Sequence, residues 1–186
     1  MKKIILGISG SLRKESYSTK LLKAFGELAP DDVDFRIADI SRFPVFNQDD
    51  EIPEPDFLVK FKEMLKPVHG VLFVTPEHNR SFPAALKNVL DWVSRPQVPA
   101  GTGSWAGKVA GIAGITPYTL GAVSAVMHLR QVIMFLNMPV LQQPEFYLTF
   151  AENKFDRDGK LVDENTKEHI RKFWKEYLAL VDKINS

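Results

Sequence analysis

The chain has no cysteine, almost no net charge and no long hydrophobic run, and each absence excludes a class of protein. Without cysteine, its 186 residues can form neither disulfides nor thiolate metal sites. A formal net charge of +1, with no dense run of Lys and Arg, gives no electrostatic field to attract nucleic acid. No segment reaches the roughly 20 apolar residues that a membrane span needs. We therefore predict no nucleic-acid partner and no membrane insertion.

Length and composition are those of an ordinary globular protein. Hydrophobic residues make up 45% of the chain and charged residues 25%, and the length suits one domain over 1–186. The N-terminal MKKIILGISGSL has a charged start but only a short apolar run, which is a poor match to a secretory signal peptide. With no cysteine to protect or oxidise, a cytoplasmic location is the expectation.

Apolar runs and helical spacings alternate along the chain. The continuous apolar runs typical of strands buried on both faces lie at 3–8, 33–38, 70–75 and 109–115. Apolar residues at helical spacing follow at 21–28, 57–65, 86–93 and 119–136. A short fifth strand is expected at 139–142, and a last helix after the polar cluster DENT, with an apolar face from Ile170 to Val181. This order predicts a doubly wound α/β sheet, with the irregular stretch 39–55 on the surface.

Small polar residues stand where the first predicted strand meets the first helix, in SGSLRKESYS at 9–18. Ligands of an open parallel sheet bind beyond the carboxyl ends of its strands, and this segment begins at such an end. A helix N-terminus there offers unpaired N–H groups and the positive end of a dipole. Hydroxyl groups and the guanidinium of Arg13 suit phosphate oxygens. The segment therefore predicts a phosphate site formed by Ser11, Arg13, Ser16 and Ser18, with the helix beginning at Thr19.

The segment matches neither common nucleotide motif. It lacks G-x-x-x-x-G-K-[ST], the loop of nucleoside triphosphate sites, and G-x-G-x-x-G, the dinucleotide fingerprint. A single terminal phosphate is then the expected guest. The alternative is structural, because serine and glycine are ordinary turn and cap residues and an exposed arginine is ordinarily a solvated charge. Taken alone, the segment leaves both interpretations open.

A second polar loop follows the third predicted strand, in TPEHNRSFPAALKNVLDWVSRP at 75–96, where Pro83 can open the next helix. Here the sequence resembles the NAD(P)H-dependent FMN reductase family of flavodoxin-like proteins, which includes quinone, chromate and azo-dye reductases. The resemblance rests on GSLRKESYS (10–18), on PEHN, Ser, Pro, LKN and DW within 76–92, and on HLRQV (128–132) and PEF (144–146). It covers nearly the whole chain.

The resemblance implies a fold and a cofactor site. The fold would be a flavodoxin-like three-layer α/β sandwich, with helices on both faces of a five-stranded parallel sheet of order 2-1-3-4-5. The first loop would bind the phosphate of FMN, and the loop after strand three would lie against its isoalloxazine and ribityl part. The implied cofactor-binding residues are Ser11, Arg13, Ser16, Ser18, Thr19, Pro76, Glu77, His78, Asn79 and Thr116.

Two positions depart from the family pattern. His78 stands where the family usually has tyrosine, which predicts a smaller stacking surface that can titrate near neutral pH. The loop after strand four reads GITPYTLG (114–121), and Pro117 removes one of the backbone donors that this loop often provides. Ile115, Thr116 and Tyr118 are the candidate flavin contacts in it. We expect these departures to alter the redox potential and the substrate pocket.

Other residues of the motifs are expected to have structural roles. Packing and helix-end bonding explain the helical motif residues Leu86, Lys87, Asn88, Asp91 and Trp92. No metal-ligand spacing links the histidines, which are His69, His78, His128 and His169. DRDG at 156–159 lacks the later ligands of a calcium loop and reads as a turn. We predict no metal ion.

The resemblance also implies the reaction. A hydride would pass from NADPH or NADH to N5 of bound FMN, and two electrons would then pass to a small acceptor such as a quinone, chromate, an azo compound or free flavin. No catalytic side chain is needed, because the cofactor carries the chemistry. The family commonly forms homodimers or homotetramers. One alternative is a flavodoxin-type one-electron carrier, although such carriers are usually strongly acidic and this chain is near neutral. Another is a flavin-free binding module that kept the fold.

Overall fold

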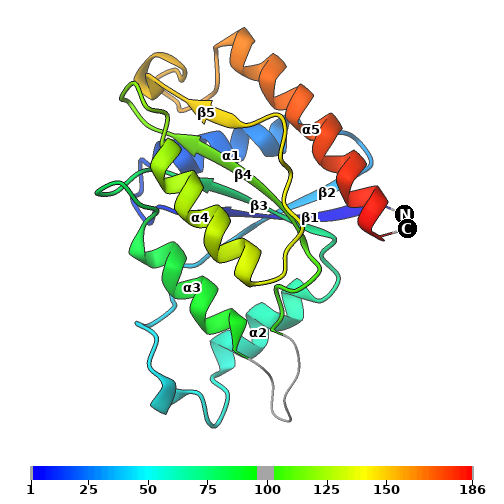
Figure 1. The fold of residues 1–186 in the computed structure, drawn as a ribbon. Helices are drawn as coiled ribbons and strands as arrows, with labels where there is room; N and C mark the ends of the chain where they lie inside the picture. Colours follow the sequence, from blue (N-terminus) through cyan, green and yellow to red (C-terminus); the bar gives the residue numbers. More distant parts are fainter. Residues whose placement is uncertain (1, 96–102, 186) are drawn as a thin grey trace.

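The computed structural model describes residues 2–95 and 103–185, over which strands and helices alternate (Figure 1). In chain order these are β1 (Lys3–Ser9), α1 (Tyr17–Glu27), β2 (Val33–Ala38), α2 (Asp56–Leu65), β3 (Gly70–Thr75), α3 (Ala84–Ser94), β4 (Val109–Ile115), α4 (Val123–Phe135), β5 (Phe146–Leu148) and α5 (Glu164–Asn185). The strands pair in parallel in the order β2-β1-β3-β4-β5. This confirms the predicted flavodoxin-like sheet.

The sheet lies between two helical layers. Helices α2, α3 and α4 cover one face, and α1 and α5 cover the other (Figure 1). Successive residues of a strand point to opposite faces, so Leu6 and Ile8 pack under α2, α3 and α4, whereas Ile5 packs under α1 and α5. Both faces of the central strands are therefore apolar, which explains their continuous hydrophobic runs. No helix in the described part of the chain is both long enough and apolar enough to cross a membrane.

The fifth strand lies later in the chain than the sequence predicted. Strand β5 is Phe146–Leu148, whereas the predicted segment 139–142 makes only one isolated parallel bridge, between Val140 and Ala110. A proline stands on either side of that bridge, at 139 and 144, and proline has no N–H to donate to a ladder. The prediction of 139–142 as the edge strand was therefore wrong. The prediction that the fifth strand pairs with β4 was right.

Burial explains why the later segment forms the strand. The Phe146 ring lies 5.2 Å from that of Phe25 and 5.9 Å from that of Phe173, between centroids, in the core formed with α1 and α5. The segment 146–148 thus contributes an aromatic side chain, Phe146, to the core between the sheet and these helices. The segment 139–142 contributes only the partly buried Val140 and the buried Leu141.

The irregular segment 39–55 runs over the outside, as predicted, but it is fastened to α3. Asn88 Oδ1 accepts from the amide of Phe46 at 2.7 Å, and Asn88 Nδ2 donates to the carbonyl of Pro44 at 2.7 Å. The indole of Trp92 donates to the same Pro44 carbonyl at 2.8 Å and packs edge-on against Phe46. The structural role expected for Asn88 and Trp92 is therefore confirmed.

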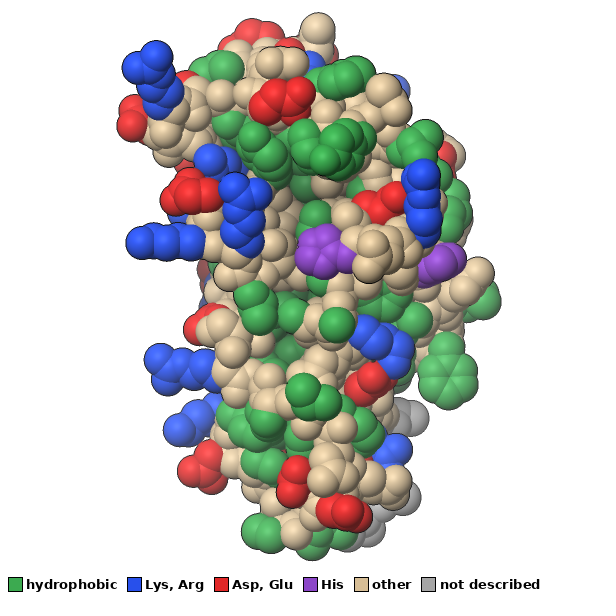
Figure 2. Space-filling view, turned by 90° about the vertical axis from the view of Figure 1, so that its left-hand side faces the viewer, with side chains coloured by type: hydrophobic (Ala, Val, Ile, Leu, Met, Phe, Trp, Pro, Cys, Tyr) green, Lys and Arg blue, Asp and Glu red, His purple; other side chains and the backbone are tan. Residues whose placement is uncertain are grey.

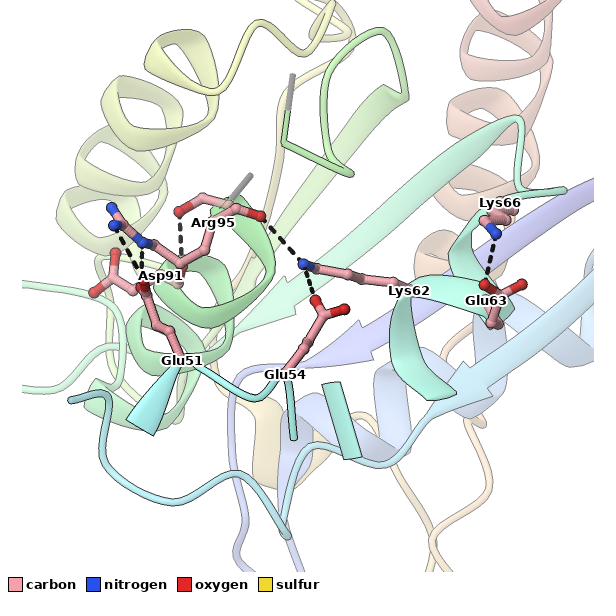
Figure 3. Close-up of polar contacts among 8 residues, drawn as sticks. Glu51, Glu54, Lys62, Glu63, Lys66, Asp91 and Arg95 are labelled. Atoms are coloured by element: carbon pink, nitrogen blue, oxygen red, sulfur yellow. Dashed lines mark hydrogen bonds and ion pairs between the residues drawn. The ribbon is translucent and has the colours of Figure 1, made fainter. Parts of the chain in front are cut away.

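Charged groups fasten the far end of the same segment (Figure 3). The Lys62 ammonium, on α2, is only 2% exposed; it pairs with Glu54 and donates to the carbonyl of Arg95 at 3.2 Å. The Arg95 guanidinium in turn pairs with Glu51. Residues 51–54 are thereby held against the ends of α2 and α3.

Candidate functional site

Three loops meet at the carboxyl edge of the sheet, which Figure 2 faces. They follow β1 (10–16), β3 (76–83) and β4 (116–122), and these three strands are neighbours in the sheet. In Figure 2 hydrophobic side chains and histidine lie near the middle of this edge, with Lys and Arg side chains along one side. Carboxyl-end loops of adjacent parallel strands form the usual ligand site of this architecture.

The loops after β1 and β3 approach each other closely at Gly10. Its amide donates to the carbonyl of Val74 at 2.8 Å, which extends the pairing of β1 with β3 by one residue. A Cβ at this position would lie 3.1 Å from Thr75 Oγ1 and 3.3 Å from Pro76 Cδ. A side chain here would be in tight contact with the loop after β3, so glycine suits this close approach.

Hydroxyl groups organise the start of α1. Ser16 is the N-cap, and its Oγ accepts from the amide of Thr19 at 3.4 Å. The buried Ser18 Oγ lies 2.7 Å from Ser16 Oγ and 3.1 Å from Ser9 Oγ, and Ser9 Oγ lies 2.9 Å from Thr19 Oγ1. The helix begins at Tyr17, two residues before the predicted start. These hydroxyls bond to one another, and the amides of the first turn have no acceptor within the helix.

The electrostatics of this helix N-terminus favour an anion. The first turn of α1 contains no acidic residue, so the positive end of its dipole is not compensated within the helix. Arg13 is exposed just before the helix, and its amide donates to Ser11 Oγ at 3.2 Å. The nearby Glu15 pairs with Lys20 at 3.3 Å. A phosphate at this point would meet backbone amides, a guanidinium and the helix dipole together.

The loop after β3 is a tight turn. His78 and Ser81 exchange two backbone hydrogen bonds of 2.8 and 2.9 Å, and the two residues between them have positive φ, 50° for Asn79 and 66° for Arg80. This is the geometry of a two-residue type I′ turn, in which asparagine is favoured. The side chains of 78–80 are exposed at the edge.

Glu77 has protein partners on another loop. Its Oε2 accepts from the amides of Ser124 at 3.2 Å and Ala125 at 3.4 Å, at the start of α4. Its Oε1 lies 3.3 Å from Nη1 of Arg80, and the side chain is 13% exposed. The carboxylate thus joins the loop after β3 to the first turn of α4.

The loop after β4 packs closely against the sheet. Thr116 is buried; its Oγ1 accepts from the amide of Tyr118 at 3.2 Å, and its own amide donates to the carbonyl of Leu148 at 3.0 Å. The side chain of Ile115 is 1% exposed and lies in the core. Tyr118, in contrast, is 75% exposed.

Gly121 fixes the end of this loop. Its φ is +59°, and a Cβ there would lie 2.8 Å from Cβ of Tyr147. The Tyr147 hydroxyl donates to Glu145 at 2.9 Å, and burial together with this carboxylate raises the pKa of Tyr147 to about 12. The phenol is therefore protonated at neutral pH, and the backbone beside it accepts only glycine without strain.

A cleft of about 540 Å³ opens between the loops after β3 and β4. Its lining combines carboxylate, amide, guanidinium and hydroxyl groups with the exposed apolar surfaces of Tyr118 and Leu120. The lining residues are Glu77, Asn79, Arg80, Thr116, Tyr118, Thr119 and Leu120.

The structure brings only some of the predicted residues into this cleft. Glu77, Asn79 and Thr116 line it, whereas Pro76 and His78 are not among its lining residues. Ser16 and Thr19 line a separate cavity of about 280 Å³ between α1 and residues 158–161. The phosphate loop and the cleft are thus two parts of one edge, joined where Gly10 meets Pro76.

Sequence reasoning missed several residues of this edge. Ser9 links the hydroxyls of α1 to β1, and its one signal was a polar side chain at the end of an apolar strand. Thr119 and Leu120 belong to the loop that departs from the family pattern, so no motif pointed to them. Within the described residues, His, Asp and Glu side chains form no cluster of three or more that could hold a metal ion.

The residues present fit FMN. The acid-free N-terminus of α1 and Arg13 suit its phosphate. The cleft supplies polar groups beside apolar walls, as a flat heteroaromatic ring with polar edges requires. The loops after β1 and β3 meet where Gly10 lies against Pro76, and Glu77 and Asn79 of the second loop line the cleft.

Comparisons with known proteins agree with this geometry. Residues 4–153 match the model of the family described as NADPH-dependent FMN reductase. A 2-hydroxy-1,4-benzoquinone reductase from Burkholderia sp is 38% identical over 174 residues, which cover 94% of this chain and 93% of that protein. A quinone reductase from Pseudomonas putida is 40% identical over 175 residues, covering 94% and 92%.

A solved structure gives the same result. FerB from Paracoccus denitrificans, described as a flavoenzyme NAD(P)H:(acceptor) oxidoreductase, superposes with a TM-score of 0.89 at 31% identity, covering 97% of this chain and 98% of that one. The match of the family model, of the sequence over most of the length and of the fold identifies the relationship: the chain belongs to the NADPH-dependent FMN reductase family.

Proposed function

We propose that this protein holds FMN along the carboxyl edge of its sheet and uses it to pass electrons from NADPH or NADH to a small acceptor. The observation that carries the proposal is the acid-free N-terminus of α1, beside Arg13, next to a cleft with apolar walls. The chain's membership of an FMN reductase family supports the same cofactor. When bound, FMN would supply hydride acceptance from the nicotinamide and two-electron delivery to the acceptor.

The phosphate end would be held at the loop after β1. In this arrangement the first-turn amides of α1 and the Arg13 guanidinium bind the phosphate oxygens. The Ser11 hydroxyl and the hydroxyl network of Ser16, Ser18 and Thr19 hold the loop in shape. The loop is then organised before the ligand arrives, which reduces the ordering cost of binding.

The ring end would lie toward the loops after β3 and β4. Asn79 and Thr116 line the cleft from these two loops, and Pro76 and His78 would border the ring from the first of them. Tyr118 and Leu120 offer apolar surface that would exclude water from one side of the ring. The cleft remains open to solvent, as alternate binding of a nicotinamide and an acceptor requires.

A quinone is the proposed acceptor. The relatives from Burkholderia sp and Pseudomonas putida are named for quinone reduction, and the open cleft with an aromatic and an aliphatic wall suits a flat, weakly polar molecule. Chromate, azo compounds and free flavin are the other acceptors that the sequence predicted, and cytoplasm remains the predicted location.

We also propose that the protein is a homodimer or homotetramer. Helix α4 exposes Met127 (43%), Met134 (73%) and Phe135 (87%), beside a groove of about 400 Å³. Exposed apolar groups gathered in this way typically mark an interaction surface. Sedimentation of the wild type should show an oligomer, and Met134→Glu should dissociate it; a monomeric wild type contradicts this assembly.

The experiment that tests the function is anaerobic reduction of the holoprotein. FMN should co-purify or bind stoichiometrically, NADPH or NADH should bleach it, and a quinone should restore its absorbance. A panel of quinones, chromate, an azo dye and free flavin then ranks the acceptors. A protein that binds no FMN contradicts the proposal. Flavin that NADPH and NADH do not reduce, but that a protein donor reduces one electron at a time, identifies a carrier instead.

A further inference from the structure

Helices α1, α3 and α4 begin after the three loops of the carboxyl edge, and α1 and α4 differ in how their first turns are satisfied. Helix α1 has Ser16 as a side-chain cap. Helix α4 begins after Ala122, which is left-handed at φ 65° and offers no side-chain hydrogen bond. Its first turn contains no acidic residue, and Ala122 and Ala125 are both fully buried. The amides of this turn therefore need an acceptor from elsewhere in the protein.

Glu77 supplies that acceptor from 47 residues away. Its Oε2 accepts from the amides of Ser124 and Ala125 at 3.2 and 3.4 Å. A carboxylate at a helix N-terminus also interacts favourably with the dipole, and this one is largely shielded, at 13% exposure. The carboxylate thus occupies the place that an anionic ligand would take at this helix.

We propose that Glu77 is a positioning residue that caps α4 across the cleft, rather than a ligand of the cofactor. It would set the distance between the loops after β3 and β4, because it belongs to the first and bonds to the helix that follows the second. It would also close the N-terminus of α4 to anions such as the phosphate. The effect on FMN rests on the proposed function, whereas the cap itself does not.

The loop after β4 is tied to α4, so the cap controls one wall of the cleft. The amide of Val123 donates to the carbonyl of Leu120 at 3.1 Å, and Gly121 lies against Tyr147 without room for a side chain. If the first turn of α4 loosens, Leu120 moves with it. The apolar wall that would cover the ring is therefore held in part by a carboxylate on the opposite loop.

The first test uses the apoprotein and needs no cofactor. In two-dimensional NMR, the amide signals of Ser124 and Ala125 should shift together as the Glu77 carboxylate is titrated, and Glu77→Gln should abolish this shift. Amide exchange at both residues should be about tenfold faster in Glu77→Ala, with Glu77→Gln in between because its side-chain oxygen still accepts one hydrogen bond.

Glu164→Gln is the matched control, since it removes one carboxylate from the first turn of another helix, α5, where Glu164 is 75% exposed. It should leave the titration of Ser124 and Ala125 unchanged. The proposal is overturned if these amides do not titrate in the wild type, or if they titrate equally in Glu77→Gln. A variant that only lowers the melting temperature would not change how the amide signals of Ser124 and Ala125 respond to pH.

Inorganic phosphate tests which helix accepts an anion. In the wild-type apoprotein it should shift the amides of Tyr17 and Ser18, and in Glu77→Ala it should shift those of Ser124 and Ala125 as well. If phosphate shifts the amide signals of Ser124 and Ala125 in the wild type, the proposal that Glu77 keeps anions from α4 is contradicted. Phosphate that fails to move the α1 amides contradicts the proposed FMN phosphate site and leaves the cap standing.

The holoprotein gives the functional consequence. Glu77→Ala should weaken FMN binding about tenfold and raise the flavin midpoint potential, because a negative charge beside the ring is lost; Glu77→Gln should restore most of the affinity but not the potential. If the wild type, Glu77→Ala and Glu77→Gln have the same FMN affinity and the same flavin midpoint potential, a positioning role for Glu77 is contradicted. If the wild type binds no FMN, the proposed function fails, and the apoprotein titration still decides the cap.

Discussion

Removing the Glu54 carboxylate should destabilise the protein more than removing Lys62, although both changes break the same ion pair. Figure 3 shows the pair formed by Lys62 and Glu54. The Lys62 side chain is 2% exposed, whereas that of Glu54 is 32% exposed. In Glu54→Gln the ammonium stays buried and loses its counter-charge. In Lys62→Met the charge itself is removed, and the carboxylate left behind can turn to water.

The expected magnitudes follow from this difference in burial. Loss of one partner of a fully buried pair costs roughly 3 to 5 kcal/mol. Because Glu54 is partly solvated and Lys62 keeps its bond to the Arg95 carbonyl, we expect about 2 kcal/mol for Glu54→Gln. Lys62→Met should cost about 1 kcal/mol or less, the scale of the hydrogen bond lost at that carbonyl.

Urea unfolding and thermal melting of the three proteins measure the difference. For a chain of this length, 2 kcal/mol corresponds to a fall in Tm of about 4 to 8 °C. Glu63→Gln is the control, since Glu63 pairs with Lys66 at 2.5 Å but both side chains are more than half exposed (Figure 3). It should change stability by less than about 0.5 kcal/mol. If Glu54→Gln is as mild as this control, or milder than Lys62→Met, the reasoning from burial is refuted.

Three further predictions concern the site and α5. Arg13→Ala should weaken FMN binding by roughly tenfold to a hundredfold, measured by flavin fluorescence, while Lys14→Ala, an exposed neighbour, should not; equal losses would exclude a specific role for Arg13. His78→Tyr should alter the flavin spectrum or its rate of reduction, and a variant identical in both places His78 away from the ring. Asp163→Ala should cost about 1 kcal/mol, because Asp163 caps α5 through Thr166. That bond, with Lys154, lowers the folded pKa of Asp163 below 3.8, so its contribution is present above about pH 4 and should disappear as the pH falls further.

Most strands could be predicted because their signals are local and repeated, whereas the order of the sheet followed from the family resemblance. Continuous apolar runs identified β1 to β4, and the motifs of both loops fixed the fold family. The fifth strand could not be placed in this way. The segment 139–142 and the true strand Phe146–Leu148 both follow α4, and the choice between them depends on the fit of Phe146 under α1 and α5. That is a tertiary property, which a single sequence does not display.

The site was predictable as a set of loops but not as a set of contacts. Sequence indicated that the segments 9–18, 75–83 and 114–121 meet at one edge, because parallel topology requires it. It could not show that Ser16 and Ser18 bond to one another, or that the Ile115 side chain turns into the core. The contacts of a loop side chain depend on the direction in which it points. Irregular loops have no repeating pattern of apolar residues from which that direction could be predicted.

The difference between α1 and α4 shows what decides where an anion binds at such an edge. Helix α1 starts after the carboxyl end of β1 and α4 after that of β4. Both lack an acidic residue in the first turn, and by the rule of helix dipoles both would attract phosphate. Glu77 breaks this symmetry, because a carboxylate already bonded to the amides of Ser124 and Ala125 opposes a second negative charge there. Among the described residues, no carboxylate bonds to the amides of the first turn of α1, where the partners are hydroxyls and Arg13 stands nearby. A residue from a different loop, rather than the sequence of α4 itself, thus decides whether the start of α4 is open to an anion.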